Sequence, residues 1–346
     1  MDCLHAAIIG CGGISAAHLL AIHSCGQLEG NVPVKLVAVA DIVEEKAQKV
    51  AQQEQCDWYA DYREMLKRDD IDVVHICTPH YLHPSMAIDA MEAGKNVFCE
   101  KPMAIRADDA QKMEETSRRT GKKLGICFQN RYNHTSQTAK ALIDSGEVGK
   151  VLGGKAIVTW FRGKEYYASG AWRGRWDTEG GGVLINQAIH SLDLLNWLCG
   201  GSKAVKAHHD QFMMKDIIEV EDTVMANLLL KNGGNALFFA TNCYVTSTLP
   251  LIEVVCEKAV LTIDDNLVIR YTDGDRRGSS ETVSNENKKL IGKAVYGSGH
   301  PLIIQDFYNC VAQDRPFFLC GGEGKQAIQI IQAIYESDRT GDYVSY

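Results

Sequence analysis

The sequence lacks the features of a secreted or membrane protein. Its first residues have no charged segment followed by a long apolar stretch, and nowhere does the chain approach the roughly 20 apolar residues that span a bilayer. It also lacks any dense run of lysine and arginine, and its net charge of −8 gives no overall attraction to nucleic acid or anionic lipid. We therefore expect a cytoplasmic globular protein whose partners are small molecules.

The twelve cysteines include no CxxC pair of the kind that marks a zinc site or a redox couple. They are scattered singly, mostly within apolar segments, as small buried side chains in a reducing compartment are. We expect no metal site.

The length of the chain and the order of its apolar segments predict the fold class. A chain of 346 residues exceeds what one hydrophobic core usually organises, so two domains are expected. In the first third, apolar runs of strand length alternate with helical periodicity, at 5–10, 34–41, 72–79, 96–102 and 122–128. This alternation predicts an α/β domain with a doubly wound parallel sheet, whose ligands bind beyond the carboxyl ends of the strands.

A glycine-rich turn follows the first predicted strand. It reads Gly10-Cys11-Gly12-Gly13-Ile14-Ser15, a GxGxxG-type pattern in which Ser15 replaces the third glycine. In such turns the first glycine permits the tight bend, the second lets a pyrophosphate approach the backbone, and the next helix offers free N–H groups to that anion. Glycine turns also occur for packing alone, so the pattern needs support from its context.

Asp41 supplies that support at the end of the second predicted strand. An acidic side chain there can accept hydrogen bonds from the adenosine ribose and repel a 2′-phosphate, which favours NAD over NADP. The alternative is that Asp41 only caps the following helix.

Polar residues also end the next two predicted strands. Thr78, Pro79 and His83 follow one strand, and Glu100 and Lys101 follow the next. We expect all five to lie at the ligand-binding edge of the sheet, with both charges facing a cleft and its cofactor instead of the core. For His83 we expect only packing beside the cofactor.

The ordered set of motifs resembles the glucose–fructose oxidoreductase / inositol dehydrogenase / rhizopine catabolism (Gfo/Idh/MocA) superfamily of sugar oxidoreductases. The segments that carry the resemblance are GCGGISAAH, AVAD, CTPHYLH, EKP, NRYN and EGGGVLINQAIHSLDLL, between residues 10 and 195. The resemblance implies a Rossmann domain, here 1–127, and an α/β domain with a large, open-faced, mainly antiparallel sheet, here 128–346. It also implies a homo-oligomer, a dimer or a tetramer, formed through that sheet. A helix at about 323–337 is expected to pack back near the first domain.

The second half of the sequence agrees with this expectation on its own terms. Strand-like runs recur there with turn residues such as those at 232–234 between them, a pattern typical of an antiparallel meander.

The resemblance assigns catalysis to Lys101 and His190, one on each side of the reacting substrate carbon. Oxidising a secondary alcohol moves a hydride to the nicotinamide while a base takes the hydroxyl proton, and an imidazole has a suitable pKa. We expect His190 to be the base and Lys101 to orient and polarise the hydroxyl. The opposite assignment, and a histidine with a structural role only, stay open.

We expect residues 180–197 to form a glycine-rich loop that enters a helix, and one stripe of that helix to carry His190 beside two further polar residues, Asn186 and Asp193. Family members often have aspartate where this chain has Asn186, and an amide cannot serve as a base. Asn186 is therefore expected to bind a sugar hydroxyl. Asp193 is expected to contact the substrate, or alternatively to pair the helix with a neighbour.

Two more segments are expected to line the cleft. In residues 129–133, Asn130 is expected to contact the cofactor, and Arg131 and Tyr132 the substrate. In residues 171–176, Trp172 and Arg173 suit a sugar face and an anionic group.

These observations predict an NAD-dependent dehydrogenase of a ring hydroxyl in a sugar, glycoside, nucleotide-sugar or cyclitol. The alternatives are an enzyme that uses transient oxidation to cleave or eliminate a glycosidic bond, and a regulator that senses NAD or sugar without chemistry.

Overall fold

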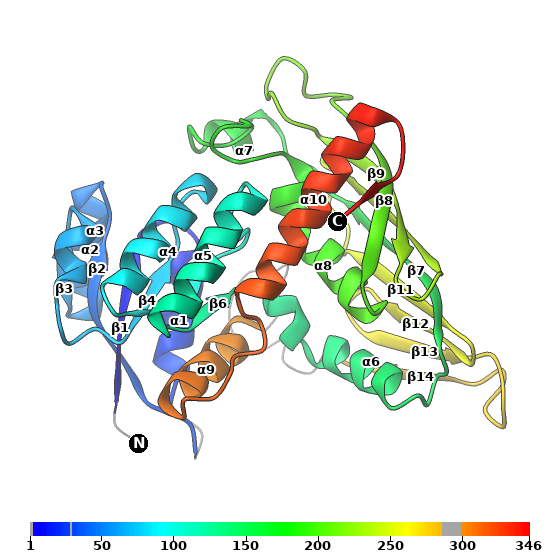
Figure 1. Ribbon diagram of the computed structural model, residues 1–346, viewed down its shortest axis with the longest axis horizontal. Helices are drawn as coiled ribbons and strands as arrows, with labels where there is room; N and C mark the ends of the chain where they lie inside the picture. The colour runs from blue at the N-terminus through cyan, green and yellow to red at the C-terminus, as the bar shows by residue number, and fades with distance from the viewer. Residues whose placement is uncertain (1–2, 28–29, 286–298) are drawn as a thin grey trace. The chain divides into compact units, whose positions relative to one another are not determined.

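The computed structural model describes residues 3–27, 30–285 and 299–346, and it divides into two compact units (Figure 1). Unit 1 contains residues 1–129 and 290–328, and unit 2 contains residues 130–289 and 329–346. The sequence analysis placed the boundary after residue 127 and gave everything beyond it to the second domain. The only return that it expected was a helix at about 323–337 packing back near the first domain, whereas the part of the chain assigned to unit 1 already begins before that helix.

Unit 1 is built on a six-stranded sheet in the order β3-β2-β1-β4-β5-β6. All of its strand pairs are parallel, as the alternation of apolar runs and helices predicted. The strands are β1 (Leu4–Ile9), β2 (Val34–Ala40), β3 (Asp57–Tyr59), β4 (Val73–Ile76), β5 (Asn96–Cys99) and β6 (Leu124–Ile126). The chain reverses its direction of travel across the sheet between β1 and β4, and such a switch point is where open α/β sheets bind ligands.

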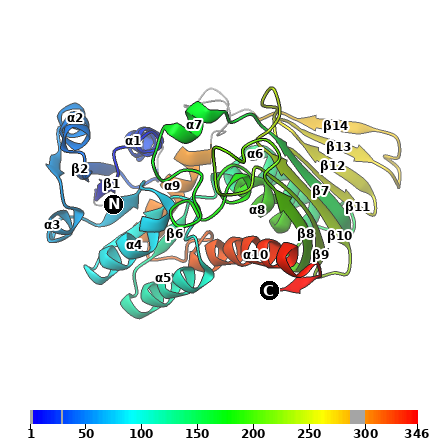
Figure 2. The same ribbon diagram turned by 90° about the horizontal axis from the view of Figure 1, so that it is seen from above.

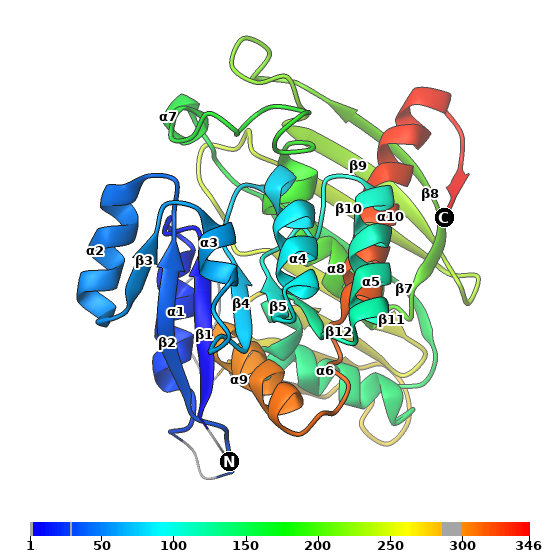
Figure 3. The same cartoon turned by 60° about the vertical axis from the view of Figure 1, so that its left-hand side comes forward.

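Helices cover both faces of this sheet. They are α1 (Ser15–Ser24), α2 (Glu44–Glu54), α3 (Tyr62–Leu66), α4 (His83–Glu92), α5 (Ala107–Thr120) and α9 (Gly299–Ala312). In Figures 2 and 3, α4 and α5 lie side by side over one face, while α9 packs against α1 on the other. The covering of both faces explains why the β4 strand is buried throughout and reads as a continuous apolar run.

Unit 2 contains a nine-stranded sheet in the order β14-β13-β12-β11-β7-β10-β9-β8-β15. The β7 and β10 strands pair in parallel and the other described pairs are antiparallel, so the sheet is mainly antiparallel, as expected. The strands are β7 (Val151–Thr159), β8 (Ser202–Asp210), β9 (Thr223–Leu230), β10 (Asn235–Thr241), β11 (Leu251–Cys256), β12 (Ala259–Ile263), β13 (Leu267–Tyr271), β14 (Ser280–Val283) and β15 (Val344–Ser345).

One face of this sheet is covered by helices. The helix α8 (Ile189–Leu198) packs against β7 and β11, and α6 (His134–Asp144) packs against β12 and β13. A short helix, α7 (Lys164–Ala168), lies in the long connection between β7 and α8. The final helix, α10 (Gly321–Thr340), begins in unit 1 and ends in unit 2, where Ser337 and Asp338 bond to β8. Among the helices of the described ranges, none is long and apolar enough to cross a bilayer.

Candidate functional site

The glycine turn between β1 and α1 has the geometry of a phosphate-binding loop. Gly10 has φ +96°, and a Cβ there would lie 2.6 Å from the carbonyl oxygen of Cys77, so only glycine fits. Gly12 and Gly13 are exposed, and no atom lies within 4 Å of where their Cβ would stand. Ser15 is the first residue of α1 and donates from Oγ to the Gly12 carbonyl over 2.6 Å. Open backbone at the amino end of a helix fits a pyrophosphate.

The Asp41 carboxylate lies beside this turn. Its Oδ2 accepts from the Cys11 backbone N–H over 2.8 Å, and its Oδ1 accepts from the Val43 N–H over 2.9 Å. Asp41 therefore supports the start of α2, the alternative that the sequence analysis raised. Each carboxylate oxygen has a second lone pair, so this role leaves capacity for the hydroxyls of a ribose.

His83 joins the ends of β4 and β5. It is fully buried, with Nδ1 2.7 Å from the Pro102 carbonyl oxygen and Nε2 2.8 Å from the Thr78 carbonyl oxygen. Burial lowers the pKa of His83 below 6.5 despite these two partners. Its ring is engaged with the backbone and joins the two strand ends, of which Thr78 and Pro79 remain partly exposed. The packing role beside a cofactor that the sequence predicted for His83 stays a prediction.

Glu100 does not face a cleft, and that part of the prediction is wrong. Its side chain is buried, accepts from His18 Nε2 over 2.8 Å, and lies 3.7 Å from His300 Nε2. Burial by itself would raise the pKa of the Glu100 carboxyl, but the hydrogen bonds from His18 and His300 hold it well below its usual value. Two imidazoles thus provide the partners that a buried carboxylate requires.

A series of hydrogen-bonded buried side chains continues from Glu100 through unit 1. His18 Nδ1 lies 2.7 Å from His75 Nδ1, and His75 Nε2 lies 2.7 Å from the Tyr308 hydroxyl on α9. His18, Glu100 and Cys127 also place ligand-type atoms within 4.8 Å of one another. Both ring nitrogens of His18 are already hydrogen-bonded, so a metal ion could bind there only if one of these bonds broke.

Lys101 and His190 lie in different units of the molecule. Lys101 follows β5 in unit 1 with its side chain partly exposed, and the Lys101–Pro102 peptide bond is cis. His190 belongs to α8 in unit 2 and is also partly exposed. Their convergence on one substrate carbon stays a prediction.

The sequence predicted a glycine-rich loop that enters one regular helix carrying both Asn186 and His190, but the helix is not regular at Asn186. Residues Val183–Gln187 form a π-helical turn, closed by the Ala188 N–H bonding to the Val183 carbonyl over 2.8 Å, and α8 starts at Ile189. Within residues 183–199, only Asn186, His190 and Trp197 are partly exposed, and the others are buried. Asn186, within the π turn, and His190, on α8, are therefore the polar residues of this segment that stay accessible.

Arg131 and Asp193, both predicted to bind substrate, bind each other. Arg131 donates from Nε to Asp193 Oδ2 over 2.8 Å and from Nη2 to Oδ1 over 2.6 Å. The two side chains are 1% and 4% exposed. Of the two roles considered for Asp193, pairing α8 with a neighbouring segment is the one observed. Asn130 and Tyr132, on either side of Arg131, are partly exposed.

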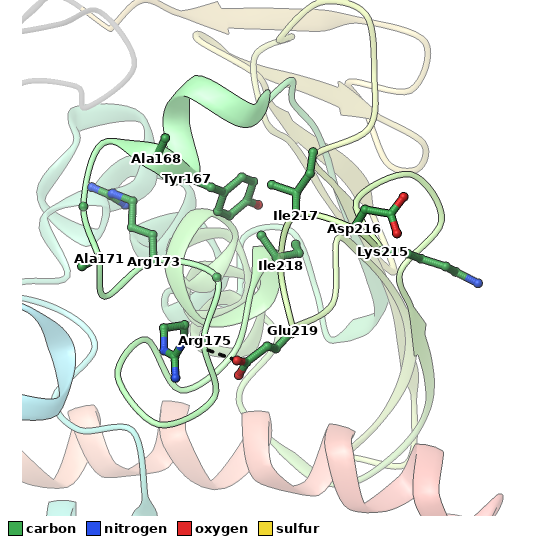
Figure 4. A pocket seen from close by; sticks show the side chains of 12 residues that line it. Tyr167, Ala168, Ala171, Arg173, Arg175, Lys215, Asp216, Ile217, Ile218 and Glu219 are labelled. Atoms are coloured by element: carbon green, nitrogen blue, oxygen red, sulfur yellow. Dashed lines mark ion pairs between the residues drawn. The ribbon is translucent and has the colours of Figure 1, made fainter.

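Unit 2 contains a pocket of about 560 Å³ between two loops, residues 167–175 and 215–219 (Figure 4). Arg173 contributes to its wall, and its guanidinium carbon lies 4.4 Å from the ring centres of both Trp172 and Tyr166. Arg175 forms an ion pair with Glu219 at 3.5 Å, the dashed line in Figure 4. Of the predicted pair, Arg173 thus lines a pocket, and Trp172 contacts the Arg173 guanidinium.

Tyr166 connects this pocket to the π turn. Its hydroxyl oxygen accepts from Arg173, from Asn186 Nδ2 over 3.2 Å and from Gln187 Nε2 over 2.8 Å. Asn186 Nδ2 also donates to Glu179, which is fully buried and accepts from the Gly174 N–H. Both N–H donors of Asn186 are therefore committed to protein groups.

Sequence reasoning missed the buried carboxylates Glu179 and Glu221. Glu221 precedes β9 and accepts hydrogen bonds from the glycine turn before the π turn. A glutamate beside a strand or a glycine run is normally a surface residue, so the pattern gave no signal of burial. Their role shows only in the folded chain, where Glu221 accepts from Gly182 and Glu179 accepts from Asn186.

Comparisons with known proteins identify the family and support the fold of both units. Residues 4–128 match the model of an oxidoreductase family with an NAD-binding Rossmann fold, and residues 136–262 match the GFO/IDH/MocA C-terminal domain. D-glucoside 3-dehydrogenase of Escherichia coli is 27% identical over 362 residues, which cover 99% of this chain and 97% of that enzyme. Inositol 2-dehydrogenase of Salmonella typhimurium is 32% identical over 209 residues, and these span only 57% of that enzyme and 59% of this chain.

A solved structure is similar over the full chain. The WlbA dehydrogenase from Bordetella pertussis, in complex with NADH and UDP-GlcNAcA, superposes with a TM-score of 0.89 at 30% identity. The superposition covers 99% of this chain and 97% of that one.

Proposed function

Because this chain belongs to the Gfo/Idh/MocA oxidoreductase family, whose amino-terminal domain is an NAD-binding Rossmann fold, we propose that it oxidises a ring hydroxyl of a sugar, glycoside, nucleotide-sugar or cyclitol. The observation that carries the proposal is the exposed glycine turn with Asp41 hydrogen-bonded beside it. The glycoside, inositol and nucleotide-sugar ligands in the names of its relatives support this substrate class.

Asp41 supports NAD over NADP as the cofactor. A carboxylate that is held by the Cys11 and Val43 amides stands where the adenosine ribose would bind. A 2′-phosphate at that position would meet a fixed negative charge, which disfavours NADP.

Bound at this site, NAD would supply the hydride acceptor for the carbon that bears the hydroxyl. His190 takes the hydroxyl proton, because an imidazole titrates near neutral pH. Lys101 orients the hydroxyl and stabilises negative charge that develops on its oxygen. Gly10, Gly12, Gly13, Ile14 and Ser15 hold the pyrophosphate, with Thr78, Pro79 and Asn130 lining the cofactor site.

The pocket beside Arg173 suits the part of the substrate remote from the reacting carbon. Tyr166 links Arg173 to Asn186, so a molecule in the pocket and a hydroxyl at Asn186 would belong to one continuous site. Trp172 offers a flat apolar surface for a sugar ring, and Arg173 a cation for an anionic group. Tyr132 is a further candidate contact.

We also propose that the enzyme is a homo-oligomer assembled through the open face of the nine-stranded sheet. Met225, Phe239, Ile157 and Leu251 are successive cross-strand neighbours over four strands, and Met225 is 42% exposed. Self-association would remove this apolar row from water. Sedimentation of the wild type and of Phe239→Glu tests the proposal, since the introduced glutamate charge should shift the protein toward monomer.

All twelve cysteines are free thiols, which supports the cytoplasm as the compartment.

The decisive experiment has two stages. First, thermal unfolding is measured with NAD, with NADP and with a sugar and cyclitol library, since a ligand that binds the native state raises the unfolding temperature. Then NADH absorbance is followed with each hit. Stabilisation by NAD together with NADH formation supports the proposal, whereas the absence of both responses across the library would overturn it. Release of an aglycone without NADH accumulation would instead indicate transient oxidation.

A further inference from the structure

Glu221 holds the amino end of the π turn with both its side chain and its backbone. Its carboxylate accepts from the Gly182 N–H over 2.9 Å and from the Leu184 N–H over 3.0 Å. Its carbonyl oxygen accepts from the Val183 N–H over 3.1 Å. Three successive amides at the start of the turn are thus satisfied by one residue, which is 1% exposed.

Tyr335 on α10 adds a further hydrogen bond to the Glu221 carboxylate. Its hydroxyl donates to Glu221 Oε1 over 3.2 Å. A Cβ at Gly181 would lie 2.0 Å from the Tyr335 hydroxyl oxygen, and a Cβ at Gly182 would lie 1.9 Å from the Glu221 carbonyl oxygen. The two glycines are therefore required by the close approach of this pair, and the turn has little freedom to move.

The turn that Glu221 holds carries the polar residues of the site. Asn186 is the fourth residue of the π turn, and α8 with His190 starts two residues after the turn ends. Glu179 fixes the same turn from the opposite end, through the side chain of Asn186. Two buried carboxylates thus bracket the segment that presents Asn186 and His190.

A carboxylate suits this position better than an isosteric amide does. The hydrogen-bond partners of the Glu221 side chain described above, two backbone N–H groups and one hydroxyl, can all donate. A glutamine whose oxygen stays at the Oε1 position would turn its NH₂ group toward the Gly182 N–H, which lies 2.9 Å from Oε2, so two donors would face each other in the interior, at a cost in the geometry of the turn. The nearly complete burial of Glu221 excludes a direct contact with substrate.

We infer that Glu221 is a positioning residue of the reaction, whose carboxylate sets the π turn and thereby the placement of Asn186 and His190 against the substrate. This inference rests on the proposed dehydrogenase function. Small displacements of catalytic groups reduce rates strongly, by up to about 100-fold for a shift of about 1 Å.

The test compares Glu221→Gln with Glu336→Gln, a matched control on the exposed side of α10 whose carboxylate pairs with Arg339 one turn along the same helix. For Glu221→Gln we expect kcat to fall by roughly 10- to 100-fold, with the Kd for NAD unchanged, because the glycine turn and Asp41, which are proposed to hold the cofactor, lie in unit 1. Glu221→Asp should recover part of the kcat, since it restores two acceptor oxygens and introduces no NH₂ group. Glu336→Gln should match the wild type.

A readout that needs no turnover separates this inference from the proposed function. The His190 imidazole is followed by NMR through a pH titration, with its signal assigned by loss in His190→Asn. In Glu221→Gln we expect a displaced His190 signal and a changed titration midpoint. Should Glu221→Gln not fold, Tyr335→Phe removes one donor and should shift the same signal in a folded protein.

A folded Glu221→Gln with wild-type kcat, or with an unmoved His190 signal, would overturn the inference. Equal losses of kcat and NAD affinity would also overturn it, because they would indicate general damage. A wild type that turns over no substrate would defeat the proposed function, while the His190 titration would still decide whether Glu221 positions the imidazole.

Discussion

Arg131 and Asp193 form a buried bidentate ion pair that joins the segment after β6 to α8. The guanidinium carbon of Arg131 also lies 5.2 Å from the centre of the Trp197 ring. The two residues are 62 positions apart in the chain. The charge of each side chain is balanced by the other, so the presence of these two charged residues requires no role in substrate binding.

Breaking this pair should cost much stability. Asp193→Asn leaves a buried guanidinium without its counter-charge, and we expect the free energy of unfolding to fall by about 3–5 kcal/mol. Urea unfolding of Asp144→Asn provides the control, because its ion pair with Lys140 is exposed and should contribute at most about 1 kcal/mol. Equal effects of the two substitutions would contradict the prediction.

Replacing Asp41 should weaken the preference for NAD over NADP. In Asp41→Asn the charge that repels a 2′-phosphate is gone, so the ratio of the two dissociation constants should move toward NADP by about tenfold, equivalent to about 1.4 kcal/mol. Asp61→Asn is the control, since Asp61 accepts from the Arg63 N–H at the start of α3 as Asp41 does from Val43 before α2. Titration of cofactor fluorescence measures the two dissociation constants in each variant. An unchanged ratio in Asp41→Asn would exclude it from cofactor selection.

Removing the proposed base should abolish turnover and spare cofactor binding. For His190→Asn we expect kcat to fall by about 10²–10⁴-fold, the usual contribution of general acid–base catalysis. Lys101→Met should lower kcat to a similar extent. Steady-state kinetics and NAD titration measure the two effects, with His134→Asn at an exposed position of α6 as the control. A wild-type kcat in His190→Asn or in Lys101→Met would refute the role assigned to the residue that was replaced.

Glu221 should make stability depend on pH. Burial raises its pKa from the ordinary 4.5 to about 7, so the folded protein retains a proton that the unfolded chain loses. This contribution is complete below about pH 4.5 and is lost as the pH rises through 7, amounting to about 3 kcal/mol. Urea unfolding of the wild type and Glu221→Gln at pH 5 and pH 8 isolates this effect. The wild type should lose stability relative to the variant at the higher pH, and a constant difference would contradict the shift.

The buried histidine beside Glu100 should matter far more than a nearby exposed one. His18→Leu leaves the Glu100 carboxylate without its closest partner, and we expect a loss of about 3–5 kcal/mol in urea unfolding. His23→Leu on the same helix removes an exposed pair with Glu54 and should cost less than about 1 kcal/mol. Similar losses in the two variants would show that the Glu100 contact adds nothing beyond helix packing.

Some elements escaped sequence reasoning because their signal is short or interrupted. The three-residue β3 is too brief to show alternation, and the π turn at Val183–Gln187 breaks the helical spacing on which the predicted stripe depended. The packing of α9 against α1 joins segments at opposite ends of the chain, and no local pattern encodes such a contact.

Local order along the chain determined the two sheet types, the glycine turn and the position of Asp41, because strand and helix periodicity and turn chemistry act over a few residues. Tertiary structure alone decided which charges point inward. Glu100, Glu179 and Glu221 read as surface residues, yet each is buried where histidines, amides or hydroxyls from distant segments offer hydrogen bonds. A buried charge is stable only when such partners meet it, and their meeting depends on the whole fold.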